Sequence, residues 1–226
     1  MKFSKKLFKT NDGSFSIKVD KLNESYHSIH GAITESKFVY IQEGLSYWNE
    51  TNKKSDCKIF EMGYGTGLNA YLSYIESQKY LKKISYTTVE LYPLSFKEIK
   101  ALNYGEFFKN KNQFLTFDDF SKVKWEYSQQ LSKIFNLLKK EVDFEKFKFD
   151  EKYDIIFYDA FGYHAQPKLW EIKYMKKCYD MLNPGGVWVS YCAKGNVRRG
   201  LEKSGFEVVR LTGPPGKREI LRALKV

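Results

Sequence analysis

The stretch Ile59-Phe-Glu-Met-Gly-Tyr-Gly-Thr-Gly-Leu-Asn-Ala70 decides the fold of this chain. An apolar run enters it, glycines at positions 63, 65 and 67 cross it, and a run compatible with a helix leaves it. Glycine lets a backbone turn sharply and lets a ligand approach without meeting a Cβ. The stretch therefore predicts a strand, a tight turn and a helix. Taken alone, it fits a nucleotide-type cofactor loop and an ordinary strand–helix turn equally well.

Two acidic residues farther along the chain favour the cofactor loop. Residues 84–90 are rich in β-branched and aromatic side chains and predict a strand that ends in Glu90, 23 positions after Gly67. A carboxylate at that place can accept hydrogen bonds from both hydroxyls of a ribose. Residues 137–143 predict another strand, and Asp143 at its end is placed either to reach an adenine amino group or to cap a helix.

The residues around the glycines distinguish between cofactors. Dinucleotide enzymes usually carry G-x-G-x-x-G, whereas this loop reads G-x-G-x-G and is preceded by Glu61. An acid beside the loop repels a pyrophosphate but suits a sulfonium and an amino-acid group. We therefore predict S-adenosylmethionine rather than NAD as the cofactor. The predicted cofactor contacts are Glu61, Gly63, Gly65, Thr66, Gly67, Asn69, Glu90, Asp143 and, from a polar aromatic loop over 23–32, Tyr26.

The remaining patterns predict alternating strands and helices. Asp12-Gly13 between apolar runs predicts a β-hairpin over 7–19, and apolar residues at helical spacing predict a helix from Thr34 to Trp48. The other predicted elements are a helix beginning at Pro93, helices and connections over 102–136, a strand over 153–159, a helix over 166–182, a turn over 183–186, a strand over 187–192, a helix over 194–204, and a closing hairpin of strands over 206–211 and 219–224.

These elements predict one α/β domain over residues 1–226, in which residues 1–50 form a hairpin and helix extension. The fold is a doubly wound, mostly parallel sheet with an antiparallel edge strand. This is the layout of the Rossmann-type class I methyltransferases.

Composition indicates the kind of partner. The chain has 226 residues, with 38 Lys and Arg against 27 Asp and Glu, which gives a net charge of +11. Such an excess favours nucleic acid, another polyanion or an anionic membrane surface as the partner, although basic residues also serve as a solvated surface. Cys57, Cys178 and Cys192 show no C-x-x-C spacing, and no stretch has the apolar length of a signal peptide or membrane span, so we expect a cytoplasmic, reduced protein. His27 and His30 lack further ligands at metal spacing, so no metal is expected.

Several motifs together resemble the methyltransferase domain of the MnmC-type enzymes, which modify the wobble uridine of tRNA, here without the fused oxidase. The matching motifs are Tyr26–Ser36, Phe60–Asn69, Trp125–Leu131, Phe157–Phe161 with Pro167 and Trp170, Pro184–Gly186, Val197–Leu201 and Gly216–Glu219. The resemblance implies methylation of the amine of 5-aminomethyl-2-thiouridine at tRNA position 34. The chain departs from the family pattern after Phe161, where Gly162-Tyr163-His164 replaces Ala-Pro beside the expected acceptor pocket.

Asp159 is the predicted catalytic residue, because a carboxylate at the carboxyl end of a central strand can orient the amine and favour its deprotonation. Its alternative role is to cap the following loop, and His164 is an alternative base. The predicted tRNA contacts are Lys194, Arg198, Arg199, Lys217, Arg218 and His164. Tyr26, Tyr163 and Trp170 are candidates for stacking on a splayed base, with core packing favoured for Trp170.

Two other functions stay open at this point. The chain can be a methyltransferase for another RNA site or for a small amine, in which case its basic surface is incidental. It can also be an inactive RNA-binding module, although intact acids at positions 90 and 159 argue against that.

Overall fold

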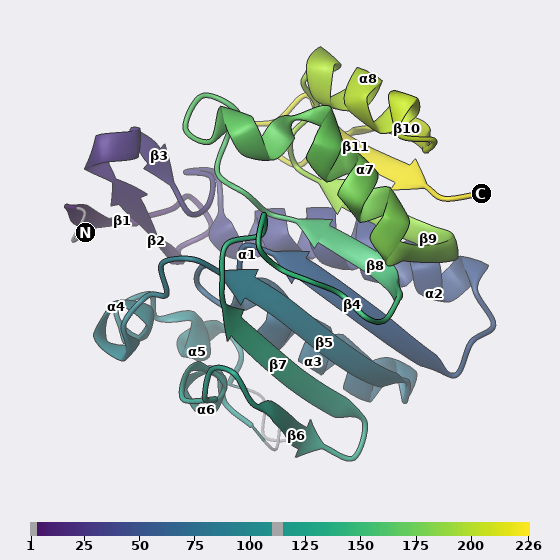
Figure 1. Cartoon of the computed structure of the whole chain (residues 1–226). Coiled ribbons are helices and arrows are strands. Elements are labelled where there is room, and N and C mark those ends of the chain that lie inside the picture. Colours follow the sequence, from purple (N-terminus) through teal and green to yellow (C-terminus); the bar gives the residue numbers. More distant parts are fainter. Residues whose placement is uncertain (1–3, 110–114) are drawn as a thin grey trace.

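A computed structural model describes residues 4–109 and 115–226, and within them an eight-stranded sheet forms the centre of the molecule (Figure 1). Its strand order is β10-β11-β9-β8-β4-β5-β7-β6. The strands are β4 (Asp56–Met62), β5 (Lys83–Glu90), β6 (Ser128–Ser132), β7 (Phe135–Glu141), β8 (Tyr153–Tyr158), β9 (Leu182–Ser190), β10 (Glu207–Thr212) and β11 (Glu219–Leu224). Parts of two sequence-based predictions, at residues 1–3 and 110–114, lie outside the described residues.

The sheet is doubly wound and mostly parallel, as predicted. Strands β7, β5, β4, β8 and β9 run parallel, and β11 pairs antiparallel with both β9 and β10. The predicted closing hairpin is therefore present, with β11 one place in from the edge. At the opposite edge β6 pairs antiparallel with β7. Strand β6 was not predicted: residues 102–136 were expected to form helices and connections, because the polar run Ser128–Ser132 lacks the apolar alternation that marks a strand.

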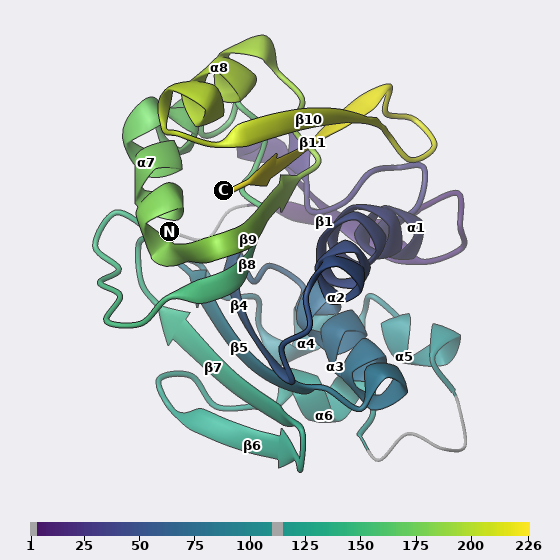
Figure 2. The ribbon, with the colours of Figure 1, turned by 90° about the vertical axis from the view of Figure 1, so that its right-hand side faces the viewer.

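Helices cover both faces of the sheet (Figure 2). One face carries α3 (Leu68–Tyr80) and a continuous helical segment over 32–51, which consists of α1 (Ala32–Ser36), a π-helical stretch (Lys37–Ser46) and α2 (Tyr47–Thr51). The other face carries α7 (Ile172–Met181) and α8 (Gly195–Lys203). Side chains of β4 alternate between the two resulting cores, with Ile59 in one and Phe60 in the other, both fully buried.

A small N-terminal unit stands beside the carboxyl ends of the parallel strands (Figure 1). Its described residues form the three-stranded sheet β1 (Lys5–Lys9), β2 (Phe15–Val19) and β3 (Glu24–Ser25), with a 3₁₀ turn at Asp20–Leu22, so the predicted hairpin is confirmed. Its turn is fixed to the start of α1 by Asp12, whose Oδ2 accepts the Thr34 N–H at 3.0 Å. Burial raises the pKa of Asp12, but hydrogen bonds, that of Ser14 first, outweigh burial and lower it to about 2. Asp12 is therefore ionised at neutral pH and keeps its hydrogen bond to the first turn of α1.

The predicted helix boundary at Pro93 is wrong. The helix here is α4 (Phe96–Lys100), and its N-cap is Ser95. The Ser95 side chain accepts the N–H of Glu98, whose carboxylate accepts the N–H of Ser95 in return. This capping box satisfies the backbone donors of the first turn and so fixes the start of the helix. Two short helices follow, α5 (Tyr104–Phe107) and α6 (Phe117–Ser121).

Two further predictions need correction after β8. The expected helix over 166–182 is divided into a 3₁₀ turn (Pro167–Trp170) and α7, because Glu171 between them is extended, with φ −73° and ψ 153°. The expected turn over 183–186 belongs to β9. Gly185 there has φ +74°, and its N–H donates to the Lys225 carbonyl, so the residues form an irregular start of the strand rather than a reversal.

No helix within the described ranges is long and apolar enough to cross a membrane. The three cysteines are buried and unpaired. Across residues 4–109 and 115–226, no group of three or more His, Cys, Asp or Glu side chains is arranged to hold a metal ion.

Candidate active site

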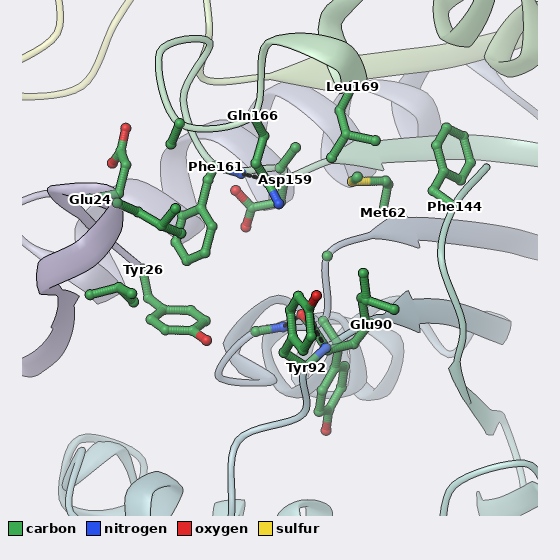
Figure 3. A pocket seen from close by; sticks show the side chains of 18 of the residues that line it. Glu24, Tyr26, Met62, Glu90, Tyr92, Phe144, Asp159, Phe161, Gln166 and Leu169 are labelled. Atoms are coloured by element: carbon green, nitrogen blue, oxygen red, sulfur yellow. Dashed lines mark hydrogen bonds between the residues drawn. The ribbon is translucent and has the colours of Figure 1, made fainter. Parts of the chain in front are cut away.

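A cavity of about 660 Å³ lies where the carboxyl ends of β4, β5 and β8 meet the N-terminal unit (Figure 3). Glu90 and Asp159 reach it from different sides, and Tyr26 and Phe161 lie next to each other on the side of the N-terminal unit. This is the edge of an open parallel sheet at which ligands generally bind. The sequence-based prediction placed the site at the same edge.

The glycine turn after β4 has a backbone that other residues adopt poorly. Gly63, Gly65 and Gly67 have φ values of +93°, +51° and +80°. A Cβ on Gly63 would lie 2.5 Å from the backbone oxygen of Asp159, and a Cβ on Gly65 would lie 3.1 Å from the ring of Tyr26. These glycines therefore serve both the turn and the close approach of other segments.

Glu90 closes β5 and is held by the backbone around it. Its Oε2 accepts the Gly65 N–H at 3.0 Å and its Oε1 accepts the Tyr92 N–H at 2.9 Å. A carboxylate oxygen can accept more than one hydrogen bond, so both oxygens keep capacity for a diol in the cavity. The position and geometry fit the ribose contact predicted from the sequence.

Asp143 lies at the same end of the cavity, just after β7. Its Oδ1 accepts the N–H of Glu145 at 2.8 Å, which closes a local turn. The side chain also lines the cavity. The alternative role as a helix cap is wrong, because residues 144–146 form a turn and not a helix. The contact to adenine stays a prediction that is compatible with this position.

Glu61 lies behind the glycine turn and is fully buried. Among the described residues that line the cavity, Asn69 is present and Glu61 is not. Asn69 donates from Nδ2 to Glu61 Oε1 at 3.1 Å and to Asp159 Oδ2 at 2.8 Å. Burial, reinforced by the charge of Asp159, raises the pKa of Glu61 well above its usual range. The structure corrects the prediction that Glu61 contacts the cofactor: the side chain does not line the cavity, and its link to the cavity is the hydrogen bond from Asn69.

Asp159 is held by two side-chain donors. Besides Asn69, the Tyr40 hydroxyl donates to Asp159 Oδ1 at 2.6 Å. Burial raises the pKa of the Asp159 carboxyl to about 7, although both hydrogen bonds act to lower it. A group that titrates near neutral pH is suited to accept and release a proton during catalysis.

Tyr40 was not predicted from the sequence as a site residue. Helical spacing pointed to Phe38, Ile41 and Leu45, and Tyr40 lies outside that set. The stretch Lys37–Ser46 is π-helical, so its side chains are arranged differently from those of an α-helix. No signal in the sequence marks this change of helix type.

The loop before α1 contacts the glycine turn. The buried His27 places Nε2 2.9 Å from Thr66 Oγ1, and burial lowers the pKa of His27 to about 4, so its ring is neutral at physiological pH. The Tyr26 ring meets Phe161 edge to face, with centroids 5.1 Å apart. Thr66 and Tyr26 both line the cavity. This loop thus packs against the glycine turn, and its predicted role in covering a ligand stays a prediction.

The segment Gly162-Tyr163-His164 connects Phe161 and Ala165, which line the cavity, but is not itself among the described residues that line it. His164 is exposed, and its Nε2 lies 3.2 Å from Glu24 Oε1. A Cβ at position 162 would overlap the Glu24 carboxylate, so glycine makes room for this contact. Trp170 is buried and donates from Nε1 to the Phe161 carbonyl at 2.9 Å, which fits the packing role expected for it.

The predicted tRNA contacts divide into two groups. Lys194, Arg199 and Arg218 are exposed, and Arg198 is partly exposed and paired with Glu202. Lys217, in contrast, lines the cavity. Its ammonium lies 3.1 Å from Glu35 Oε1, and the Glu35 side chain is 10% exposed. Its position thus differs from the outer surface that the prediction assumed.

The strand order, the glycine turn and the two acids define a Rossmann-type methyltransferase. A family model described as S-adenosyl-L-methionine-dependent methyltransferase matches residues 95–226, and the chain belongs to this family. The arrangement of Glu90, the glycine turn and the adjoining cavity fits S-adenosylmethionine as its cofactor.

Comparisons with known proteins agree with this assignment. The chain is similar to "tRNA 5-methylaminomethyl-2-thiouridine biosynthesis bifunctional protein MnmC" of Actinobacillus pleuropneumoniae (serotype 5b, strain L20), at 25% identity over 231 residues, and of Leptospira interrogans (strain Fiocruz L1-130), at 28% over 210 residues. Each match covers 89% of this chain and 32% of the relative, so the chain spans about a third of their length.

Among solved structures, the chain is similar to MnmC2 from Aquifex aeolicus, with a TM-score of 0.75 at 21% identity, over 99% of this chain and 71% of that one. It is also similar to DesVI from Streptomyces venezuelae, with a TM-score of 0.50 at 11% identity, over 86% of this chain and 92% of that one. At these identities the matches show the fold.

Proposed function

We propose that this chain transfers a methyl group from S-adenosylmethionine to the amine of 5-aminomethyl-2-thiouridine at wobble position 34 of tRNA. The names of the MnmC relatives support this choice of substrate, and the sequence motifs quoted above extend across the same region. The observation that carries the proposal is the group of carboxylates at the end of the cavity where Asp159 lies, beside the glycine turn.

Three carboxylates line that end of the cavity: those of Asp159, Glu24 and Glu35. An aminomethyl group is mainly protonated at neutral pH, so acidic walls favour its entry as a cation. Asp159 is adjacent to the glycine turn through the close approach of its backbone to Gly63. An amine bound to Asp159 is therefore next to the reactive end of the methyl donor.

The bound cofactor supplies an electrophilic methyl group on a sulfonium centre. Glu90 and the glycine turn hold the donor, while Asp159 accepts a hydrogen bond from the acceptor ammonium and takes its proton. The nitrogen lone pair that Asp159 frees would accept the methyl group of bound S-adenosylmethionine, whose sulfur would keep the electron pair of the broken carbon–sulfur bond. Asp159 is suited to this step because its pKa lies near 7.

The proposed contacts to the anticodon stem-loop are the exposed residues Lys194, Arg199, Arg218 and His164 and the partly exposed Arg198. The net charge of +11 supports a polyanionic substrate. We place the activity in one methyltransferase domain over residues 1–226, acting in the cytoplasm where tRNA is modified.

The direct test is incubation of the purified chain with labelled S-adenosylmethionine and tRNA that carries 5-aminomethyl-2-thiouridine. Nucleoside analysis should show the label in 5-methylaminomethyl-2-thiouridine, and tRNA lacking the aminomethyl group should stay unlabelled. Label in a different nucleoside, or none with active cofactor binding, would refute the proposed substrate.

Salt dependence separates a tRNA enzyme from one acting on a small amine. If the four Lys and Arg residues among these contacts each bind a phosphate, RNA affinity should fall roughly 100-fold between 50 and 200 mM salt. An enzyme for a small amine would keep nearly constant affinity for its acceptor over this range.

A further inference from the structure

Lys217 reaches the cavity because the turn between β10 and β11 folds toward the N-terminal unit. This turn is Gly213-Pro-Pro-Gly216. Gly216 has φ +84°, and a Cβ there would overlap the ring of His30, so the turn and the N-terminal loop are in close contact. Lys217 lines the cavity, whereas the next residue, Arg218, is exposed.

The ammonium of Lys217 has a defined place. It lies 3.1 Å from Glu35 Oε1 and 4.2 Å from the centroid of the Tyr191 ring. Glu35 is itself fixed, because its Oε2 accepts the N–H of Ser28 at 2.8 Å. An ammonium group has three donors, so Lys217 retains hydrogen-bonding capacity for a ligand after pairing with Glu35.

Lys217 and Asp159 act on the same end of the cavity. Both line it. Burial raises the pKa of the Asp159 carboxyl, and the nearby charge of Lys217 counteracts that effect. Tyr191 links the two residues, because its hydroxyl donates to the carbonyl of Ala160, next to Asp159, at 2.8 Å, and its ring packs against the Lys217 ammonium. An acceptor amine bound to Asp159 therefore has a fixed cation close to it.

We infer that Lys217 positions the acceptor base by donating a hydrogen bond to the ring carbonyl beside the carbon that carries the aminomethyl group. This inference rests on the proposed function, in which the acceptor is a 5-aminomethyluracil ring. In that ring the aminomethyl group and the C4 carbonyl are attached to neighbouring carbons. When Asp159 binds the amine, the carbonyl oxygen is presented to the adjacent ammonium of Lys217.

The same contact makes Lys217 a specificity residue. A cytosine ring carries an amino group at C4, so it would set a second donor against the ammonium. A site that pairs with a polar substrate group rejects an analogue in which that group is replaced, because its own polar group then stays unpaired. Lys217 therefore selects uracil over cytosine rings that carry the same aminomethyl substituent.

The test uses two anticodon stem-loop RNAs that differ only at the wobble position, one with 5-aminomethyl-2-thiouridine and one with 5-aminomethyl-2-thiocytidine. The measured quantity is the ratio of their kcat/KM values. The wild-type enzyme should favour the uridine RNA by about 10- to 150-fold, the range for one hydrogen bond to a charged group. In Lys217→Met the ratio should fall close to one, mainly through loss of activity on the uridine RNA.

Two variants act as controls. Arg218→Met removes the neighbouring exposed charge and should leave the ratio unchanged, and Lys217→Arg should keep most of the preference because it retains a cationic donor. A purely structural role of Lys217 would lower both activities equally and leave the ratio at its wild-type value, which contradicts the inference.

Three further results would contradict either the inference or the proposed function. Equal activity of the wild-type enzyme on the two RNAs contradicts the inference without any variant, so a variant that does not fold leaves it testable. A phosphate contact would instead make Lys217→Met weaken both RNAs alike and reduce the salt slope by about one, and the inference would fail. If the wild-type enzyme binds S-adenosylmethionine but methylates neither RNA, the proposed function itself is overturned.

Discussion

The two ends of the cavity are built in opposite ways. The donor end comes from one βαβ unit, with the glycine turn over 63–67 and Glu90, and backbone N–H groups hold the Glu90 carboxylate. The acceptor end joins Asp159 to Tyr40, 119 positions earlier in the chain, and to Lys217 from the β10–β11 turn. Side chains hold the carboxylate of Asp159. The donor end depends on local backbone geometry, whereas the acceptor end depends on packing between distant segments.

The largest expected effect is at the acceptor end. Asp159→Asn removes the proposed base, so kcat/KM should fall by about 10²- to 10⁴-fold, the usual contribution of such a group. The affinity for S-adenosylmethionine should stay near that of the wild type if the two ends are separate. Steady-state methyl transfer and calorimetric binding measure the two quantities. Full activity of Asp159→Asn would disprove the proposed mechanism.

The pH dependence of activity and stability in the wild-type enzyme tests the pKa of Asp159. Because kcat/KM reports groups of the free enzyme, it should rise with pH through an inflection near 7. The carboxyl binds its proton more tightly in the folded chain than at its ordinary pKa of 3.8, so the free energy of unfolding should fall between pH 4 and 7 and level off above. In Asp159→Asn this fall should be smaller. Thermal unfolding without cofactor measures it, and a rise in stability over that range would contradict the assignment.

Gly63→Ala tests the place where the two ends touch. The positive φ and the contact with the Asp159 backbone should lower the free energy of unfolding by about 1–3 kcal/mol or more, and both cofactor binding and activity should suffer. Gly105→Ala is the matched control, since a Cβ there meets nothing within 4 Å. Urea unfolding compares them. An unchanged midpoint for Gly63→Ala would show that the turn tolerates a side chain.

Glu90→Gln should act on the donor end alone. Losing a charged acceptor for the ribose should weaken S-adenosylmethionine binding by about 10- to 100-fold, with little change in kcat at saturating cofactor. Glu141→Gln is the control, because Glu141 is the exposed partner of Glu90 in the register of β7. Equal affinities of the two variants would remove Glu90 from the cofactor site.

The smallest expected effect is that of Tyr40→Phe. Removing one hydrogen bond to Asp159 should lower kcat/KM by about 3- to 10-fold. Because that bond lowers the pKa of Asp159, the inflection of the pH profile should move above 7. Tyr47→Phe is the control from the same helical segment, since the Tyr47 ring packs under Arg222. An inflection that stays in place would show that Tyr40 does not tune Asp159.

The sequence predicted most of the sheet and the donor end. It placed the glycine turn, Glu90, Asp143 and Asp159 at one edge, and the structure brings them into one cavity. It missed β6, whose polar residues carry no strand pattern, and it misplaced the start of α4 at Pro93 because the Ser95 capping box was not considered. Local rules predicted these boundaries poorly because caps and edge pairing compete with periodicity.

By itself, the sequence determined the strand, the glycine turn and the acid at the end of β5, because these depend on backbone freedom and on spacing within one βαβ unit. Only the tertiary structure decided the acceptor end. Tyr40, in the π-helical stretch, donates a hydrogen bond to Asp159. Lys217, after the β10–β11 turn, lines the cavity and pairs with Glu35, although the sequence predicted it as an RNA contact. These contacts join segments far apart in the chain, and the burial that raises the pKa of Asp159 exists only after those segments pack together.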